Sequence, residues 1–253
     1  MILVTGATGH LGSALTPLLL DAGQEVRGLS RRERAGSGLS WVTGDLRTGE
    51  NLDHAVDGAD VIVHAATDGR PSRSADLPGT RQLLSAVERA GTRPHLVYIS
   101  IVGIDDHPFG YYKTKAAAER LIIDSGVPYT ILRTTQWHQL LDRALRVLSR
   151  SPVVPVPTAT RVQPMDVSDV ALRMADLALG APAGRVPDLG GPEIHDADYI
   201  VRSYLRAAGK HRALVPFRIP GATGPAIRDG RHLTPEHRDG KVTWPDFLEA
   251  KFR

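Results

Sequence analysis

The sequence contains no cysteine among its 253 residues. This absence excludes disulfide bonds, thiol catalysis and thiolate metal sites. The chain also lacks an apolar run near the roughly 20 residues that a membrane-spanning helix needs. It has no long basic run either, because the arginines are scattered and the formal net charge is only +3. We therefore expect no membrane segment, no nucleic-acid partner and no metal site.

The start of the chain shows no pattern of a secretory signal, because a short strand pattern begins at once. We therefore expect a cytoplasmic protein. The hydrophobic content of 42% and charged content of 23% are typical of a globular protein with a substantial core. The length suits one large α/β domain or a domain with a small appendage. Nothing in the sequence predicts an oligomeric state.

The first twelve residues, MILVTGATGHLG, predict a buried strand, a tight glycine turn and the start of a helix. Such a turn aims the free amides of a helix N-terminus at an anion, and glycine lets a pyrophosphate approach the backbone. The spacing is G-x-x-G-x-x-G, which differs from the G-x-G-x-x-G of two-domain dehydrogenases. A glycine-rich connector is the alternative interpretation. The residues expected at a dinucleotide are Gly6, Thr8, Gly9, His10 and Leu11.

Strand and helix patterns then alternate along the chain. Further strands are expected at 24–30, 40–43, 59–66, 94–101 and 126–133, with helical spacing between them. This alternation predicts an α/β fold, a doubly wound parallel sheet of the Rossmann type. Such sheets bind ligands at the carboxyl ends of their strands. The residues at those ends are Gly6, Arg31, Asp45, Ala65 and Ser100.

The end of the second strand indicates which dinucleotide binds. An acidic residue there accepts the 2′-hydroxyl of NAD, whereas arginine accommodates the 2′-phosphate of NADP. This chain has Ser30, Arg31 and Arg32, with no acid at the strand end. A planar guanidinium pairs well with phosphate oxygens. We therefore expect NADP(H), the alternative being that both arginines are ordinary surface charges.

A second motif follows the fifth predicted strand. Ser100 ends that strand, and Tyr111 and Lys115 lie four residues apart on a predicted helix, so they share one face. Together with the TGATGHLG turn, these residues resemble the short-chain dehydrogenase/reductase superfamily. The likeness is to its extended and atypical branches, in particular the NAD(P)H-binding, nitrogen-regulator-like group. Tyrosine and lysine at this spacing also occur on many solvated helices, which is the alternative.

The chemistry explains these residue types. A phenol with a pKa near 10 is a poor proton donor at neutral pH, and a neighbouring ammonium brings that pKa toward the working range. The resemblance implies that Ser100 polarises the substrate oxygen, that Tyr111 protonates it, and that Lys115 also holds the nicotinamide ribose. It further implies cofactor contacts by Asp45 and Leu46 at the adenine, and by Ala65 and Ala66 at the ribose and phosphates. For Asp45, a turn or helix cap is the alternative.

The resemblance places the substrate segment after the sixth strand, at Gln136, Trp137 and His138. Trp137 in the core and His138 as a helix cap are the alternatives. We expect one Rossmann-type domain with its core at 1–133 and 166–190, and a substrate-covering region at 134–165 and 191–253. Within that region, we expect the proline-rich stretch 151–160 to be irregular, and we expect Thr243 to begin a final capped helix.

The resemblance implies an NADPH-dependent oxidoreductase that reduces a carbonyl or quinone of a small molecule, or catalyses the reverse oxidation. Two alternatives stay open at this point. One is a dinucleotide-sensing regulator without turnover, and the other is an epimerase or lyase that keeps its cofactor tightly bound. Relatives of the first kind often lack the tyrosine and lysine pair, which this chain has.

Overall fold

The computed structural model describes residues 1–36, 38–67 and 76–253. The polar loop expected at 68–76 lies, apart from Asp76, outside the described residues. The chain divides into two compact units. The first unit comprises 1–100, 110–133 and 171–187, and the second comprises 101–109, 134–170 and 188–253.

The first unit is built on a seven-stranded sheet with the order β3-β2-β1-β4-β5-β6-β9. The strands are β1 (Ile2–Thr5), β2 (Val26–Ser30), β3 (Ser40–Thr43), β4 (Val61–His64), β5 (His95–Ile101), β6 (Tyr129–Thr134) and β9 (Gly184–Arg185). β1 pairs in parallel with both β2 and β4, so the order of the strands reverses at β1. This is the doubly wound Rossmann arrangement expected from the alternating pattern.

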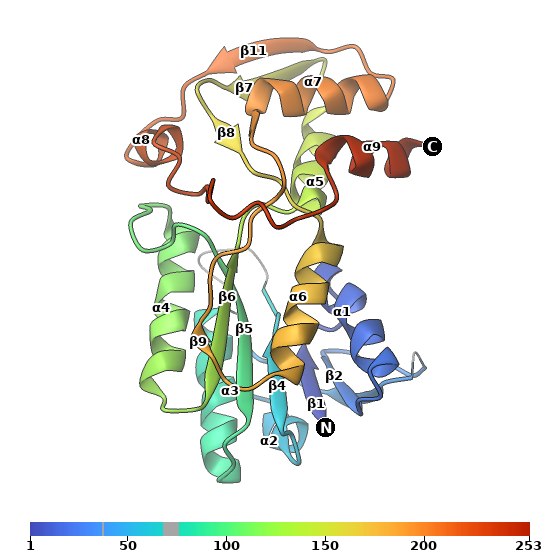
Figure 1. The fold of residues 1–253 in the computed structure, drawn as a ribbon, viewed down its shortest axis with the longest axis vertical. Helices are drawn as coiled ribbons and strands as arrows, with labels where there is room; N and C mark the ends of the chain where they lie inside the picture. The colour runs from blue at the N-terminus through green and yellow to red at the C-terminus, as the bar shows by residue number, and fades with distance from the viewer. Residues whose placement is uncertain (37, 68–75) are drawn as a thin grey trace. The chain divides into compact units, whose positions relative to one another are not determined.

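Helices cover both faces of this sheet (Figure 1). They are α1 (His10–Asp21), α2 (Leu52–Val56), α3 (Leu77–Ala90), α4 (Gly110–Asp124) and α6 (Val167–Leu179). β4 is shorter than the predicted 59–66, but its apolar run is buried as expected for a central parallel strand. Gly23 ends α1 and Gly91 ends α3, both at positive φ where glycine has no Cβ to clash. Leu3, Ile62 and Leu96 lie at the centre of the core and are fully buried.

The second unit has a small core of its own. Its elements are α5 (His138–Leu148), β7 (Val153–Pro157), β8 (Arg161–Val162), β10 (His195–Asp196), α7 (Ala197–Ala207), β11 (Ala213–Phe217), α8 (Thr223–Arg228) and α9 (Trp244–Phe252). Trp244, Tyr204 and Val154 are buried together. α9 begins at the predicted capping box, in which the Thr243 and Asp246 side chains each bond to the other's backbone amide.

The expectation of an irregular 151–160 stretch was wrong. Residues 153–157 form β7, which pairs in parallel with β11. Proline removes an amide donor and is therefore confined to edge strands or bulges. In a two-stranded sheet both strands are edges, so Pro155 of β7 and Pro216 of β11 are tolerated when their missing amides face away from the partner. The prolines hid the alternation in which Val154 and Val156 are buried and Val153 and Pro155 are exposed.

The boundary between the units differs from the predicted one at 101–109, a stretch that the sequence placed with the sheet. The structure assigns this stretch to the second unit. Arg231 donates to the carbonyl oxygen of Asp106 at 3.1 Å, and the rings of His107 and His232 are 6.5 Å apart. Gly103 has φ +81 and lies so close to the backbone of Arg231 that a Cβ would not fit. These tertiary contacts are not encoded in any local pattern.

None of the helices in the described part of the chain is long and apolar enough to cross a membrane.

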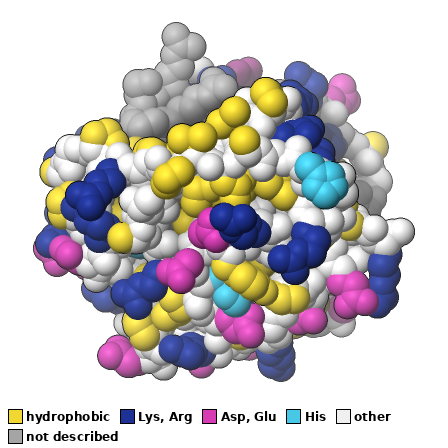
Figure 2. Space-filling view, turned by 90° about the horizontal axis from the view of Figure 1, so that it is seen from above, with side chains coloured by type: hydrophobic (Ala, Val, Ile, Leu, Met, Phe, Trp, Pro, Cys, Tyr) yellow, Lys and Arg dark blue, Asp and Glu magenta, His cyan; other side chains and the backbone are white. Residues whose placement is uncertain are grey.

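On the sheet formed by β7 and β11, three hydrophobic side chains are exposed: Val153, Val215 and Phe217. Figure 2 shows hydrophobic side chains mixed with charged side chains of both signs on the face seen from above.

Candidate functional site

The glycine turn after β1 is held tightly against the end of β4. Gly6 has φ +70, and a Cβ there would lie 2.8 Å from the backbone of Ala65 and Ala66. A Cβ on Gly12 would collide with the carbonyl oxygen of Gly6, whereas the Gly9 amide donates to that oxygen at 2.9 Å. α1 begins at His10, so Thr8, His10 and Leu11 lie at the helix N-terminus. Its first amides are available to an anion, which fits the pyrophosphate of a dinucleotide.

The end of β2 carries a cluster of arginines. Arg31 and Arg32 are exposed, and the hydroxyl of Ser30 accepts from the Arg32 amide at 3.3 Å. The Arg34 Nε also donates to Ser30 Oγ at 3.3 Å, and its guanidinium lies 5.7 Å from the centre of the Trp41 ring. Sequence reasoning did not single out Arg34. Its three-dimensional proximity to Ser30 adds a third positive charge beside the predicted 2′-phosphate position.

Asp45 and Leu46 are both engaged by their surroundings. The carboxylate of Asp45 accepts from the Arg47 amide at 2.8 Å and from its guanidinium at 3.0 Å. The hydrogen bond from Arg47 holds the pKa of Asp45 below its ordinary value. This local turn is the alternative that the sequence left open. Leu46 is buried in the core of the first unit, so its side chain packs inward.

At the end of β4, the ring of His64 is fully buried between two threonines. Thr5 Oγ1 is 2.7 Å from Nδ1, and Thr80 Oγ1 is 3.0 Å from Nε2. Thr80 uses its single proton toward the carbonyl oxygen of Asp76, so it must accept from His64 Nε2. Burial, assisted by the charge of Lys115, lowers the pKa of the imidazole to about 3, so the ring is neutral near pH 7. His64 is a core histidine, as expected, and the Ala66 amide donates to Thr5 Oγ1 at 3.4 Å.

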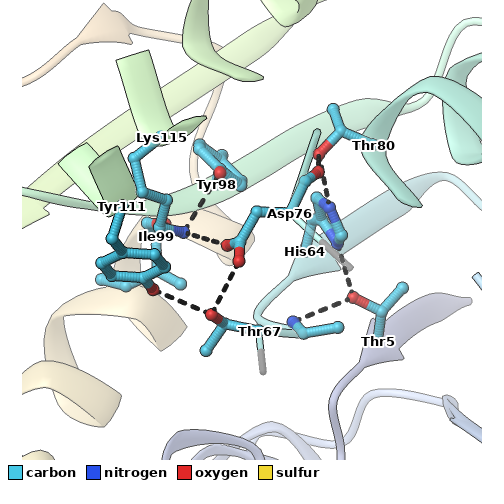
Figure 3. A network of polar contacts seen from close by, with 10 residues as sticks. Thr5, His64, Thr67, Asp76, Thr80, Tyr98, Ile99, Tyr111 and Lys115 are labelled. Carbon is cyan, nitrogen blue, oxygen red and sulfur yellow. Dashed lines mark hydrogen bonds and ion pairs between the residues drawn. The ribbon is translucent and has the colours of Figure 1, made fainter. Parts of the chain in front are cut away.

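Lys115 lies inside a buried polar network (Figure 3). Its Nζ donates to the Tyr98 hydroxyl at 3.1 Å and to the Ile99 carbonyl oxygen at 2.9 Å, and it lies 3.2 Å from Asp76 Oδ1. Burial alone would lower the pKa of Lys115, but the charges and dipoles of Tyr98, Asp76 and Tyr111 outweigh it and raise that pKa. An ammonium has three protons, of which Tyr98 and Ile99 accept two, whereas the contact with Asp76 is an ion pair.

Tyr111 shares its helix face with Lys115, as the spacing predicted, and both side chains point toward the same network (Figure 3). The Tyr111 hydroxyl lies 2.8 Å from Thr67 Oγ1, and Thr67 donates to Asp76 Oδ2 at 3.0 Å. Tyr111 is half-buried and Thr67 is exposed, so the phenol is accessible, whereas Asp76 is fully buried. One carboxylate thus joins the tyrosine and the lysine through its two oxygens.

Ser100, at the end of β5, has a buried hydroxyl without a hydrogen-bond partner among the described residues. A buried polar group without a partner costs about 1–3 kcal/mol, so most native structures avoid one. An unused donor at the carboxyl end of a strand suits a ligand oxygen. This observation fits a bound substrate in addition to the dinucleotide.

The three residues expected at the substrate lie in the second unit. The side chain of Gln136 donates to the His232 carbonyl oxygen at 2.9 Å and accepts from the Gln163 amide at 3.1 Å. Trp137 is half-buried and donates to Thr134 Oγ1 at 3.0 Å. His138 is fully buried, with its ring 5.6 Å from that of Trp244. Of the three, His138 has the surroundings of a packed core residue.

Sequence reasoning missed three members of the network, namely Thr67, Asp76 and Tyr98. Asp76 precedes α3 directly, a position where aspartate commonly caps the helix. Its side chain makes no cap bond and turns instead to Lys115 and Thr67. The only available signal was a hydroxyl residue, Thr67, directly after the predicted strand 59–66. The pairing of Asp76 with Lys115 depends on tertiary structure and has no local pattern.

Comparison with known proteins gives consistent results. A family model described as NAD(P)H-binding matches residues 6–177. The photosystem II assembly factor Ycf39 of Cyanophora paradoxa is 29% identical over 87% of this chain and 71% of that protein. A (4-alkanoyl-5-oxo-2,5-dihydrofuran-3-yl)methyl phosphate reductase of Streptomyces griseus is 34% identical over 83% of this chain and 74% of that protein. The NADPH-dependent quinone oxidoreductase of Escherichia coli, solved with NADPH, has a TM-score of 0.83 at 17% identity and full coverage of both chains.

Proposed function

Because this chain belongs to the NAD(P)H-binding family, we propose that it is an NADPH-dependent oxidoreductase that reduces a carbonyl or quinone group of a small molecule, or catalyses the reverse oxidation. The observation that carries the proposal is the position of Tyr111 and Lys115. They lie on one helix face and join the ends of β4 and β5 (Figure 3), and Ser100 at the end of β5 has a buried hydroxyl with no hydrogen-bond partner among the described residues. The likeness to the Streptomyces griseus reductase supports the same reaction class.

Each residue has a distinct role in this reaction. When bound, NADPH supplies the hydride that reduces the substrate carbon. The Ser100 hydroxyl donates a hydrogen bond to the substrate oxygen, which gains negative charge as that carbon is reduced. Tyr111 gives its hydroxyl proton to the same oxygen, and Lys115 stabilises the phenolate that remains. The substrate oxygen gains one proton and Tyr111 loses one.

The cofactor is NADPH rather than NADH. The basis is the end of β2, where Ser30 is followed by Arg31 and Arg32 and joined in space by Arg34. A 2′-phosphate adds two negative charges that these guanidinium groups pair with. An acid that would accept the 2′-hydroxyl of NAD is missing from the strand end.

Residues of the second unit contribute to substrate recognition in this proposal. Gln136 and Trp137 are the residues we expect to face it, since both are half-buried and follow β6 directly. His138 is fully buried, so its contribution is indirect, through the packing of α5. The identity of the substrate depends on this unit, because the fold of the first unit is shared by proteins with many functions.

A second candidate function is a dinucleotide-binding protein without turnover. Two observations favour it: Lys115 forms two hydrogen bonds and an ion pair inside the protein, and one relative is named as a photosystem II assembly factor. In that case NADPH binding changes the protein's interactions rather than a substrate. The intact set of Ser100, Tyr111 and Lys115 favours the enzyme.

The test is NADPH consumption over a panel of small carbonyl compounds and quinones, with NADPH binding measured in parallel. The enzyme proposal predicts that at least one compound is reduced and that deuterium at C4 of labelled NADPH appears in the product. Tight NADPH binding without any turnover would contradict it and favour the non-catalytic candidate. A purified protein that carries cofactor through gel filtration would instead favour an epimerase or lyase.

A further inference from the structure

The hydrogen bonds around Tyr111 have a defined direction. A carboxylate can only accept, so Thr67 must use its single proton toward Asp76 Oδ2. Thr67 Oγ1 then accepts from Tyr111, whose hydroxyl lies 2.8 Å away. In this state the phenol proton points at Thr67. Among these described groups, the direction follows because the carboxylate can only accept and each hydroxyl has a single proton.

From this direction we propose that Thr67 is a hydroxyl switch that stabilises the Tyr111 phenolate. The proposal rests on the proposed function, in which Tyr111 gives its proton to a substrate oxygen. Before that step the Thr67 hydroxyl donates to Asp76. After it, the hydroxyl rotates and donates to the Tyr111 oxygen, which now carries the negative charge. The Tyr111 O–H bond breaks and a substrate O–H bond forms, while the Thr67 O–H bond stays intact.

Asp76 is the positioning residue of this switch. It acts through Thr67 and does not touch the reacting oxygen. When Thr67 turns away, the buried carboxylate keeps its ion pair with Lys115 at 3.2 Å, so it is not left as an isolated buried charge. Without a cation nearby, a buried carboxylate would depend on the hydrogen bond from Thr67, and breaking that bond would cost more free energy. The Lys115 charge therefore lowers the cost of rotating the hydroxyl.

Asp76 itself is fixed by the start of α3. Its carbonyl oxygen accepts from both the amide and the hydroxyl of Thr80, and the same Thr80 hydroxyl contacts buried His64. The ring of His64 in turn stacks on Tyr98 at 5.4 Å. This frame holds Asp76 in place, whereas the Thr67 side chain is exposed.

The titratable groups that surround the phenol of Tyr111 can be named for the described residues. Lys115 on α4 and Tyr98 on β5 interact with it electrostatically, Asp76 acts through Thr67, and His64 on β4 is neutral. The positive charge of Lys115 favours the phenolate, whereas the negative charge of Asp76 opposes it. Thr67 carries no charge, so its effect on Tyr111 comes only from its hydroxyl. Replacing that hydroxyl tests the proposal without changing the charges.

The experiment compares Thr67→Val with Thr67→Ser. Valine has the shape of threonine without the hydroxyl, and serine keeps the hydroxyl. The ionisation of Tyr111 is followed by NMR of protein labelled at tyrosine Cζ, with the Tyr111→Phe spectrum identifying its signal. Loss of the donor destabilises the phenolate, so we expect the pKa of Tyr111 to rise by about one unit in Thr67→Val. Thr67→Ser should restore the parent value.

Asp76→Asn should move the same pKa in the opposite direction. An asparagine amide can donate to Thr67 and free its hydroxyl for Tyr111, and it no longer opposes the phenolate by charge. An unchanged Tyr111 pKa in Thr67→Val, or a Thr67→Ser variant that behaves like Thr67→Val, would overturn the proposal. Asp76 is buried against Lys115, so Asp76→Asn can fail to fold. In that case the comparison of Thr67→Val with Thr67→Ser decides whether the proposal holds.

Turnover gives a separate readout. With a substrate that the parent reduces, Thr67→Val should lower kcat about tenfold, equivalent to ~1.4 kcal/mol, and leave NADPH affinity unchanged. Thr67→Ser should recover most of the rate. Absence of turnover in the parent itself would contradict the proposed function, whereas the NMR titration would still decide whether Thr67 stabilises the phenolate.

Discussion

Gly6→Ala should both destabilise the protein and weaken NADPH binding. Gly6 has φ +70, a backbone conformation that costs an alanine about 1–2 kcal/mol. The added Cβ would also lie 2.8 Å from backbone atoms of Ala65 and Ala66, which cannot move aside as a side chain can. Such overpacking typically adds about 1–3 kcal/mol. We expect a total loss of about 2–5 kcal/mol in the free energy of unfolding.

Gly23→Ala is the matched control. Gly23 follows the other end of α1 at φ +75, and no described atom lies within 4 Å of a Cβ built there. It therefore carries the same conformational cost without the collision, about 1–2 kcal/mol. Urea unfolding of the two variants measures both costs. The difference between their losses in the free energy of unfolding gives the cost of the collision between the turn and the end of β4.

NADPH affinity completes this comparison. The collision should displace the turn from the position that receives the pyrophosphate, so Gly6→Ala should bind NADPH at least about tenfold more weakly, or ~1.4 kcal/mol. Gly23→Ala should bind like the parent. The reasoning is refuted if both variants lose equal stability, or if Gly6→Ala keeps full affinity for NADPH while folded.

Three further predictions follow from other parts of the first unit. NADPH should bind at least about tenfold more tightly than NADH in titrations of the parent. The double variant Arg31→Ala, Arg32→Ala should reduce this ratio of affinities. Equal affinities in the parent would show that these arginines are surface charges. Lys115→Met should cost about 3–5 kcal/mol in urea unfolding because it removes the cation 3.2 Å from the buried Asp76 carboxylate, and adding Asp76→Asn should recover part of that loss; no recovery would contradict the ion pair. The folded pKa of His64, about 3, lies below its unfolded value, so the unfolded state binds more protons between pH 6.5 and 3 and stability falls as pH decreases through this range. At pH 5 the loss is about 2 kcal/mol relative to pH 7, and a His64→Gln variant with the same pH dependence would contradict this assignment.

Local patterns in the sequence were sufficient to predict much of the first unit. The strand, glycine turn and helix of residues 2–21 follow from apolar spacing and from glycines where a Cβ does not fit. The shared face of Tyr111 and Lys115 follows from helix geometry alone. In each case the decisive interactions lie within a few residues of one another, so the sequence carries the information directly.

Other features depend on contacts between distant parts of the chain. β7 and β11 contain prolines, and only their pairing with each other makes them strands. Lys115 was expected at a ribose, and its hydrogen bonds to Tyr98 and Ile99 and its ion pair with Asp76 were not predicted. No local pattern distinguishes an aspartate that caps a helix from one that turns to a buried lysine. The candidate site is therefore predictable in its elements but not in its hydrogen bonds.

The turnover of Tyr111→Phe measured beside that of Tyr112→Phe tests the central claim most directly. Both tyrosines are half-buried neighbours on α4, and both variants remove only a hydroxyl. With any carbonyl or quinone that the parent reduces, Tyr111→Phe should lower the rate of NADPH consumption about 10²–10⁴-fold, while NADPH affinity and the free energy of unfolding change little. Tyr112→Phe should retain nearly the parent rate. Full activity in Tyr111→Phe, or an equal loss in both variants, would contradict the assignment of Tyr111 as the proton donor.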